Sequence, residues 1–240
     1  MIFLRSALFN LLFFGGTTFL AFACLPILLL PRRYLICLQR FWTGGMAWLL
    51  SHVVGITAEI RGREYLPEGA FLVASKHQSA WETMAYVFLL RDPSFVLKRE
   101  ILLIPVFGLY VRKAGLVPID RTRGVAALRR MLRSAGKAAE EGRPIVIFPE
   151  GTRVAPGSHS PYHAGIVALY THLHLPVVPV ALNSGLYWSR RSFLKRPGKI
   201  VLEFLPPIPE GLGKSAFLEE VEQRIEGATD RLVAEAEGAA

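Results

Sequence analysis

A histidine and a glutamate five positions apart form the first group in this chain that could perform acid–base chemistry. His77 lies in "KHQSAWET" (residues 76–83), just after an apolar run at residues 71–75, and Glu82 follows it in the same segment. A neutral imidazole can take up a proton near pH 7, and a carboxylate that accepts a hydrogen bond from the other ring nitrogen stabilises the protonated form. The pair is therefore suited to remove the proton of a hydroxyl group whose oxygen attacks a carbonyl carbon.

The same segment also carries the pattern of a helix start. Ser79 and Glu82 have the spacing of a capping box, in which the serine caps the helix and the glutamate reaches back to its first turn. Positions five apart lie about 140° around a regular helix, so His77 can meet Glu82 only if it precedes the helix. A purely capping role for Glu82 thus stands beside the catalytic one, although a side chain that reaches back also approaches His77.

The elements that must position this pair recur along residues 57–240. Short apolar runs typical of strands occupy residues 71–75, 94–98, 116–120, 144–149, 176–183 and 199–205. Helical patterns lie between or after them, at residues 80–90, 123–141, 163–174 and 215–236. This alternation predicts an α/β fold with a largely parallel, mixed sheet flanked by helices. Ligands of such folds lie beyond the carboxyl ends of the strands, so the residues after each run are the candidates for a site.

Three further segments with polar residues stand at such strand ends. They are "GLVPIDR" (115–121), "FPEGTR" (148–153) and "VPVALNSG" (178–185). Together with "KHQSAWET", "FVLKREI" (95–101) and "IPVFG" (104–108), they resemble the motifs of the 1-acyl-glycerol-3-phosphate acyltransferase family, over about residues 70–185. The chain departs from the family pattern in two places. The first motif has Glu82 where the family usually has aspartate, and the usual aromatic residue before Ile119 is absent.

The resemblance implies a reaction and a role for the first motif. The reaction would transfer a fatty acyl group from acyl-CoA or acyl carrier protein to the free sn-2 hydroxyl of 1-acyl-glycerol 3-phosphate, giving phosphatidic acid. His77 would be the base and Glu82 its orienting acid, without a metal, a cofactor or a covalent acyl-enzyme. The fold implied is that of glycerolipid acyltransferases.

Phosphate recognition would fall to basic side chains and exposed backbone N–H groups, because a guanidinium can give a phosphate two parallel hydrogen bonds. The resemblance implies that substrate is bound by residues of the later motifs, namely Lys98, Arg121, Glu150, Gly151, Thr152 and Arg153. The arginines and the Gly-Thr turn suit the acceptor's phosphate, and Glu150 would organise the loop or the acceptor. Lys98 could meet phosphates of the donor. A surface ion pair, a tight turn and a solvated strand end are the respective structural alternatives.

The first 56 residues differ in composition from the rest. Residues 7–30 carry no charge, and as one helix they would be about 36 Å long, enough to cross a hydrocarbon core of about 30 Å. A cleaved signal peptide is the alternative, but this apolar run is too long for one. Arg5 precedes the run, while Arg32, Arg33 and Arg40 follow it, so the positive-inside rule places the remaining chain in the cytoplasm.

Residues 34–56 form a second apolar segment, either a helix packed on the first or one lying in the membrane interface. Whether the N-terminal region spans the membrane or enters one leaflet stays open. The chain is therefore divided into membrane-anchoring helices at residues 1–56 and an acyltransferase domain at residues 57–240.

Charge and hydropathy together favour a lipid surface as the partner. The 240 residues carry a formal net charge of +9, yet 52% of them are hydrophobic and the mean hydropathy is +0.35. Nucleic acid would account only for the charge, whereas an anionic membrane accounts for both properties. Three alternatives remain: acylation of another lyso-lipid such as lyso-ornithine lipid, acylation of glycerol 3-phosphate, and non-catalytic binding of anionic lipid.

Overall fold

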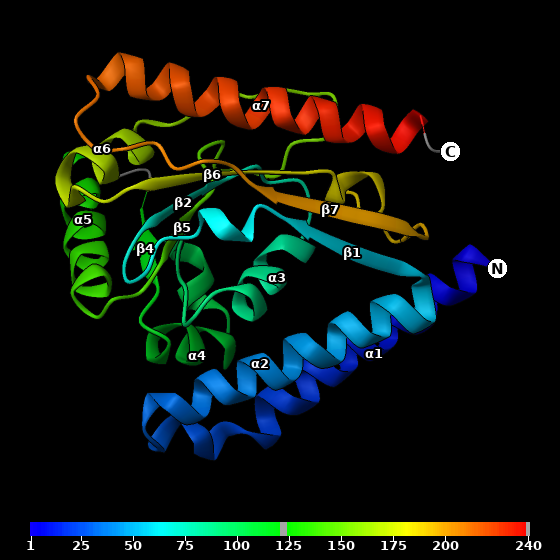
Figure 1. Ribbon diagram of the computed structural model, residues 1–240. Coiled ribbons are helices and arrows are strands. Elements are labelled where there is room, and N and C mark those ends of the chain that lie inside the picture. Colours follow the sequence, from blue (N-terminus) through cyan, green and yellow to red (C-terminus); the bar gives the residue numbers. More distant parts are fainter. Residues whose placement is uncertain (121–123, 239–240) are drawn as a thin grey trace.

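The computed structural model describes residues 1–120 and 124–238 and contains a seven-stranded sheet with helices on both faces (Figure 1). The strands are β1 (Ile56–Arg61), β2 (Leu72–Ser75), β3 (Ser94–Lys98), β4 (Val117–Ile119), β5 (Ile145–Ile147), β6 (Val177–Leu182) and β7 (Gly198–Phe204). Their order across the sheet is β1-β7-β6-β2-β5-β3-β4. Neighbouring strands are parallel except for β6 and β7, so the predicted largely parallel α/β sheet is confirmed.

The helices form one layer on each face of the sheet. They are α1 (Ile2–Ala23), α2 (Arg32–Leu49), α3 (Trp81–Leu89), α4 (Phe107–Lys113), α5 (Gly124–Glu140), α6 (Ala164–Leu173) and α7 (Lys214–Gly238). Successive side chains of a strand point to opposite faces, so β2 contributes to two cores. Val73 packs in the core that includes α2 and α3, whereas Leu72 and Ala74 pack in the core that includes α5, α6 and α7. Figure 1 shows α7 across the sheet from α1 and α2.

The predicted strands and helices lie within two residues of their observed limits, but two elements were not predicted. β1 is an edge strand, and it pairs with β7 from the far end of the chain. α4 is only seven residues long and follows Val106, whose φ of 62° is left-handed. Short elements of this kind carry too little periodicity to be recognised from their own sequence.

The N-terminal apolar region forms two helices and not one. α1 ends at Ala23, a 3₁₀ turn occupies Leu25–Leu29, and α2 runs back beside α1 (Figure 1). Pro26 lies in the turn, and proline cannot donate the backbone hydrogen bond that a continuing α-helix needs. The apolar run at residues 7–30 therefore does not form one continuous helix. α1 is nevertheless long and apolar enough to cross a membrane, and most of its surface is not covered by the rest of the protein.

α1 is attached to the α/β domain near both of its ends. Near its start, Phe9 is fully buried and its ring meets the edge of Trp188, with centroids 5.4 Å apart. Ser6 Oγ accepts a hydrogen bond of 2.9 Å from the backbone N–H of Lys195. Near its end, the carbonyl oxygen of Ala21 accepts one of 2.8 Å from the Tyr110 hydroxyl. The helix thus lies along the flank of the domain and does not project away from it.

Candidate active site

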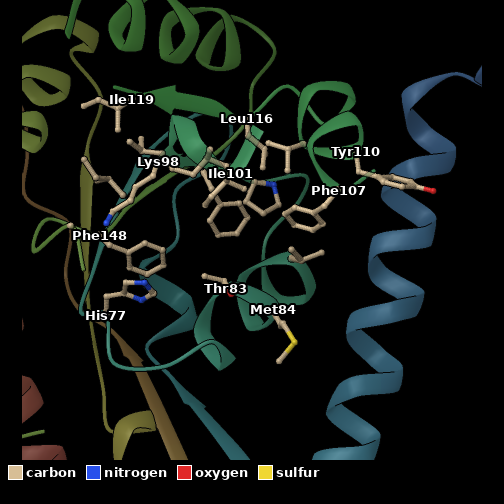
Figure 2. Close-up of a pocket in the computed structure, with 18 of the residues that line it drawn as sticks. His77, Thr83, Met84, Lys98, Ile101, Phe107, Tyr110, Leu116, Ile119 and Phe148 are labelled. Carbon is tan, nitrogen blue, oxygen red and sulfur yellow. The ribbon is translucent and has the colours of Figure 1, made fainter. Parts of the chain in front are cut away.

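The carboxyl ends of three adjacent strands bring together the segments "KHQSAWET", "FPEGTR" and "VPVALNSG". β2 lies between β6 and β5. His77 follows the end of β2, Ser184 follows the end of β6, and Phe148 follows the end of β5. The ring of Phe148 stacks on the His77 imidazole with centroids 3.9 Å apart, as Figure 2 shows. The carbonyl oxygen of His77 accepts a hydrogen bond of 2.8 Å from the backbone N–H of Val154. The histidine is therefore held by the loop that follows β5.

His77 and Glu82 are in direct contact. Nδ1 of His77 lies 2.8 Å from Oε1 of Glu82. The contact is possible because His77 precedes α3, which begins at Trp81, so the angular spacing of a regular helix does not apply. With Nδ1 engaged by the carboxylate, Nε2 is the ring nitrogen left for a substrate hydroxyl, and His77 lines a cavity.

The carboxylate of Glu82 makes the contacts of a helix cap as well as the contact with His77. It accepts hydrogen bonds of 2.7 Å from the Ser79 N–H and 2.8 Å from the Gln78 N–H, which are contacts of a helix cap. Ser79 Oγ accepts one of 3.0 Å from the N–H of Trp81. The capping residue by backbone position is Ala80 and not Ser79, because α3 starts one residue later than predicted. One side chain therefore caps the helix and binds the histidine.

Glu82 is completely buried, and two serine hydroxyls complete its surroundings. Ser79 Oγ donates to Glu82 Oε2 at 2.6 Å, and Ser184 Oγ donates to the same oxygen at 2.9 Å. Burial by itself raises the pKa of the Glu82 carboxyl, but the hydrogen bonds from His77 and Ser79 outweigh it and hold the pKa below its usual range. The group is therefore an ionised carboxylate that can stabilise an imidazolium at His77.

Glu150 lies behind the loop that carries His77 and does not line the cavity. It is buried, and its Oε2 accepts a hydrogen bond of 3.1 Å from the backbone N–H of His77. Its Oε1 accepts one of 2.7 Å from Nζ of Lys76. Of the two roles expected for Glu150, these contacts fit the organisation of the loop and do not fit contact with the acceptor.

A large cavity extends from His77 to the N-terminal helices. Its volume is about 1030 Å³, at the upper end for small-molecule pockets, and its walls are mainly apolar. In Figure 2, His77 and Phe148 lie at one side, and Tyr110 lies at the other, next to an N-terminal helix. Leu20 of α1 and Trp42 of α2 also line the cavity. The space is suited to an extended hydrocarbon chain.

Basic and polar groups gather at the part of the cavity near His77. Four of the predicted substrate-binding residues line the cavity: Lys98, Gly151, Thr152 and Arg153. Nε of Arg153 is buried and lacks a hydrogen-bond partner within residues 1–120 and 124–238, so the guanidinium retains a free donor. Arg121, predicted to bind the same phosphate, lies outside the described residues.

Several residues around the site were not predicted from the sequence. Arg190 and Arg191 line the cavity, and Nη1 of Arg190 donates a hydrogen bond of 3.1 Å to the carbonyl oxygen of Arg153. Ser184 lies in "VPVALNSG", a segment to which no catalytic or binding residue was assigned. Lys76 directly precedes His77 in "KHQSAWET", and this position was the one sign in the sequence that it could belong to the site. Glu226 lies in α7 among ordinary charged residues and gave no signal.

A histidine in contact with a buried carboxylate, at the strand ends of an α/β sheet and beside a long apolar cavity, is an arrangement that fits an enzyme that transfers acyl groups. Residues 57–183 match the family model described as Acyltransferase. The 1-acyl-sn-glycerol-3-phosphate acyltransferase of Pseudomonas aeruginosa is 37% identical to this chain, and the match covers 97% of the chain and 91% of that protein. The chain belongs to the acyltransferase family.

More distant proteins show the same likeness. An enzyme of that name from Limnanthes alba is 31% identical, over 80% of this chain and 69% of the plant protein. The fold resembles the crystal structure of the 1-acyl-sn-glycerophosphate (LPA) acyltransferase of Thermotoga maritima, with a TM-score of 0.79 and 22% identity. That match covers 97% of this chain and 98% of the other. The family resemblance expected from the motifs is thus confirmed.

Proposed function

We propose that this acyltransferase moves a fatty acyl group from a thioester donor, acyl-CoA or acyl carrier protein, to the free sn-2 hydroxyl of 1-acyl-glycerol 3-phosphate. The product is phosphatidic acid, a phospholipid precursor. The observation that carries the proposal is the contact of His77 with Glu82 beside a cavity that joins a basic region to apolar walls. The names of the relatives from Pseudomonas aeruginosa and Limnanthes alba support this acceptor.

The geometry supports a mechanism in which His77 acts first as base and then as acid. Nε2 takes the proton of the acceptor hydroxyl as its oxygen attacks the thioester carbonyl carbon. The imidazolium that forms is stabilised by the Glu82 carboxylate on Nδ1. The tetrahedral intermediate then breaks its carbon–sulfur bond, and the proton passes from Nε2 to the departing thiolate. The acyl group thus passes directly from the donor's sulfur to the acceptor's oxygen, without an acyl-enzyme.

The polar and the apolar parts of the cavity bind different parts of the substrates. Arg153 binds the acceptor's phosphate with Gly151 and Thr152, because its buried Nε is a donor in need of an acceptor. Arg121 is assigned to the same phosphate on the basis of the sequence pattern alone. Lys98 lines the same cavity and is placed to meet a phosphate of the donor. The apolar walls toward α1 and α2 accommodate an acyl chain.

The site of action is the cytoplasmic face of a membrane. Exposed apolar side chains of α1, such as Phe14 and Phe19, are suited to lipid, and the basic residues around the two helices suit an anionic leaflet. Residues 1–56 are the membrane-anchoring part and residues 57–240 the catalytic domain, although the two share one core. Because both ends of α1 contact this domain, a position within one leaflet is favoured over an isolated span.

The test is an assay of the purified full-length protein in mixed micelles. Four acceptors are offered: 1-acyl-glycerol 3-phosphate, glycerol 3-phosphate, lyso-ornithine lipid and a zwitterionic lysophospholipid. Each acceptor is tested with acyl-CoA and with acyl carrier protein, and products are identified by mass spectrometry. The expected product is phosphatidic acid, formed by the wild type and not by His77→Ala. Preferred acylation of another acceptor, or no transfer with either donor, would overturn the proposal.

A further inference from the structure

A buried cluster of charged side chains lies behind the catalytic loop and outside the cavity. Lys76 is 1% exposed, and its Nζ donates to Glu150 Oε1 and to Glu226 Oε2, each at 2.7 Å. A third hydrogen bond, of 3.3 Å, goes to the carbonyl oxygen of Ser158. Oε1 of Glu226 accepts one of 2.8 Å from the Tyr162 hydroxyl. Segments that are distant in the chain, including the C-terminal helix α7, thus meet at one ammonium group.

The main effect of the cluster is to fix the positions of its side chains, and its contribution to the stability of the fold is smaller. Removing an ammonium and two carboxylates from water is costly, and well-packed apolar side chains often stabilise a core as well as buried ion pairs do. All three protons of the Lys76 ammonium have an acceptor, so the side chain is fully constrained. A constrained polar network in a protein interior fixes the positions of the groups that it joins.

The groups that the cluster joins are the neighbours of the catalytic histidine. Lys76 directly precedes His77 in the chain, so its anchored side chain restrains the backbone that carries the imidazole. Glu150 binds the ammonium with one oxygen and the backbone N–H of His77 with the other, at 3.1 Å. Glu226 supplies the contact from α7, where its Oε2 accepts a hydrogen bond of 2.7 Å from the ammonium.

From these contacts we infer that Lys76 and Glu226 are positioning residues for His77, so that the C-terminal helix sets the rate of acyl transfer. The inference rests on the proposed function, in which His77 is the base. Without the Glu226 carboxylate, Lys76 loses one of its two charged partners and Glu150 shifts with it. The histidine is then displaced from the acceptor hydroxyl. Arg153 and the apolar walls stay in place, so the chemical step slows while both substrates still bind.

The experiment compares Glu226→Gln with Glu235→Gln in the full-length enzyme. Both substitutions remove one carboxylate from α7, but Glu235 binds Arg61 at 2.9 Å, away from the catalytic loop. For Glu226→Gln, kcat is expected to fall about 10- to 100-fold, the scale of a small misplacement of a catalytic group. The KM of each substrate should stay within about twofold, the change expected when only the chemical step is affected. Glu235→Gln should retain wild-type kinetics.

A check of folding at the assay temperature separates a positioning role of Glu226 from a merely structural one. Circular dichroism must show each variant fully folded at that temperature, so that loss of folded protein does not lower kcat. If Glu226→Gln fails to fold, Tyr162→Phe takes its place, since it removes only the hydroxyl that binds Glu226. A few-fold lower kcat with unchanged KM is then expected.

The outcomes assign any failure to one of the two proposals. A wild type that does not acylate 1-acyl-glycerol 3-phosphate refutes the proposed function. An active wild type with equal kcat in folded Glu226→Gln overturns the positioning inference alone. An equal fall in kcat for Glu235→Gln would also overturn this inference, because loss of any carboxylate from α7 would then slow the reaction.

Discussion

Ser184 lies 102 residues after Glu82 in the chain, and its hydroxyl donates a hydrogen bond of 2.9 Å to the Glu82 carboxylate. This contact joins the loop after β6 to the helix that follows β2. Glu82 is thus held by the start of its own helix and by a distant loop. The orientation of His77 depends on both.

Replacing Ser184 with alanine should destabilise the protein. The change leaves a buried, ionised acceptor with one donor fewer, and a hydrogen bond to a charged group contributes about 1.5–3 kcal/mol. Unfolding of the purified protein in detergent measures the loss. Ser192→Ala is the control, because that hydroxyl bonds an exposed carbonyl and the change should cost little. Equal unfolding free energies for the two variants would contradict the role given to Ser184.

His77→Ala should remove activity while leaving the fold and membrane binding intact. Loss of general-base assistance lowers the rate by about 10²–10⁴. His172→Ala, at an exposed position of α6, is the matched control and should behave as wild type. Steady-state rates and flotation with anionic vesicles are measured together. A His77→Ala variant with near-normal turnover would show that the histidine is not the base.

The stability contributed by Glu82 should depend on pH in a defined direction. The folded-state pKa of this carboxyl is held below its ordinary value of 4.5, so its ionised form stabilises the fold at neutral pH. This contribution is fully present above the unfolded-state pKa and is lost as pH falls through the lower, folded-state pKa. The difference in unfolding free energy between wild type and Glu82→Gln should therefore narrow below about pH 4.5. A difference that stays constant with pH would contradict the assignment.

Arg153→Lys should impair use of the acceptor more than use of the donor. Lysine keeps the charge but loses the paired donors of the guanidinium, and one charge-assisted hydrogen bond is worth about one to two decades in kcat/KM. The same result is expected for Arg153→Ala and, from the sequence pattern, for Arg121→Ala. Kinetics with each substrate varied separately provide the measurement, with Arg129→Lys on the exposed face of α5 as control. Loss of donor affinity alone would place these arginines at the donor.

Membrane attachment should resist high salt but respond to a charge on α1. Salt screens charges and leaves apolar burial intact, so washing in high salt should not release the full-length protein. Phe19→Glu, at a side chain 70% exposed, should weaken attachment without unfolding. Phe9→Ala should instead lower stability by about 3–5 kcal/mol, because Phe9 is fully buried in the core. Complete release by salt alone would refute the anchor.

Local patterns in the sequence were sufficient for six of the seven strands in the described residues, for most helices and for the contact of His77 with Glu82. His77 and Glu82 are five residues apart, and a strand end followed by a helix cap is specified by neighbouring residues. Such short-range chemistry can be recognised without knowing the rest of the chain. The turn that divides α1 from α2 was harder to place, because Pro26 permits either a bend or a break in an otherwise uniform apolar segment.

Tertiary structure alone decided which distant side chains support the pair. Ser184 reaches Glu82 across 102 positions, and Lys76 reaches Glu226 across 150. In the sequence, Glu226 is one of many charged residues in α7, and such residues usually face water. Only the packing of α7 against the sheet removes it from solvent and brings it to the Lys76 ammonium. A contact of this kind depends on how separate elements pack, and that information is not carried by the pattern of any one of them.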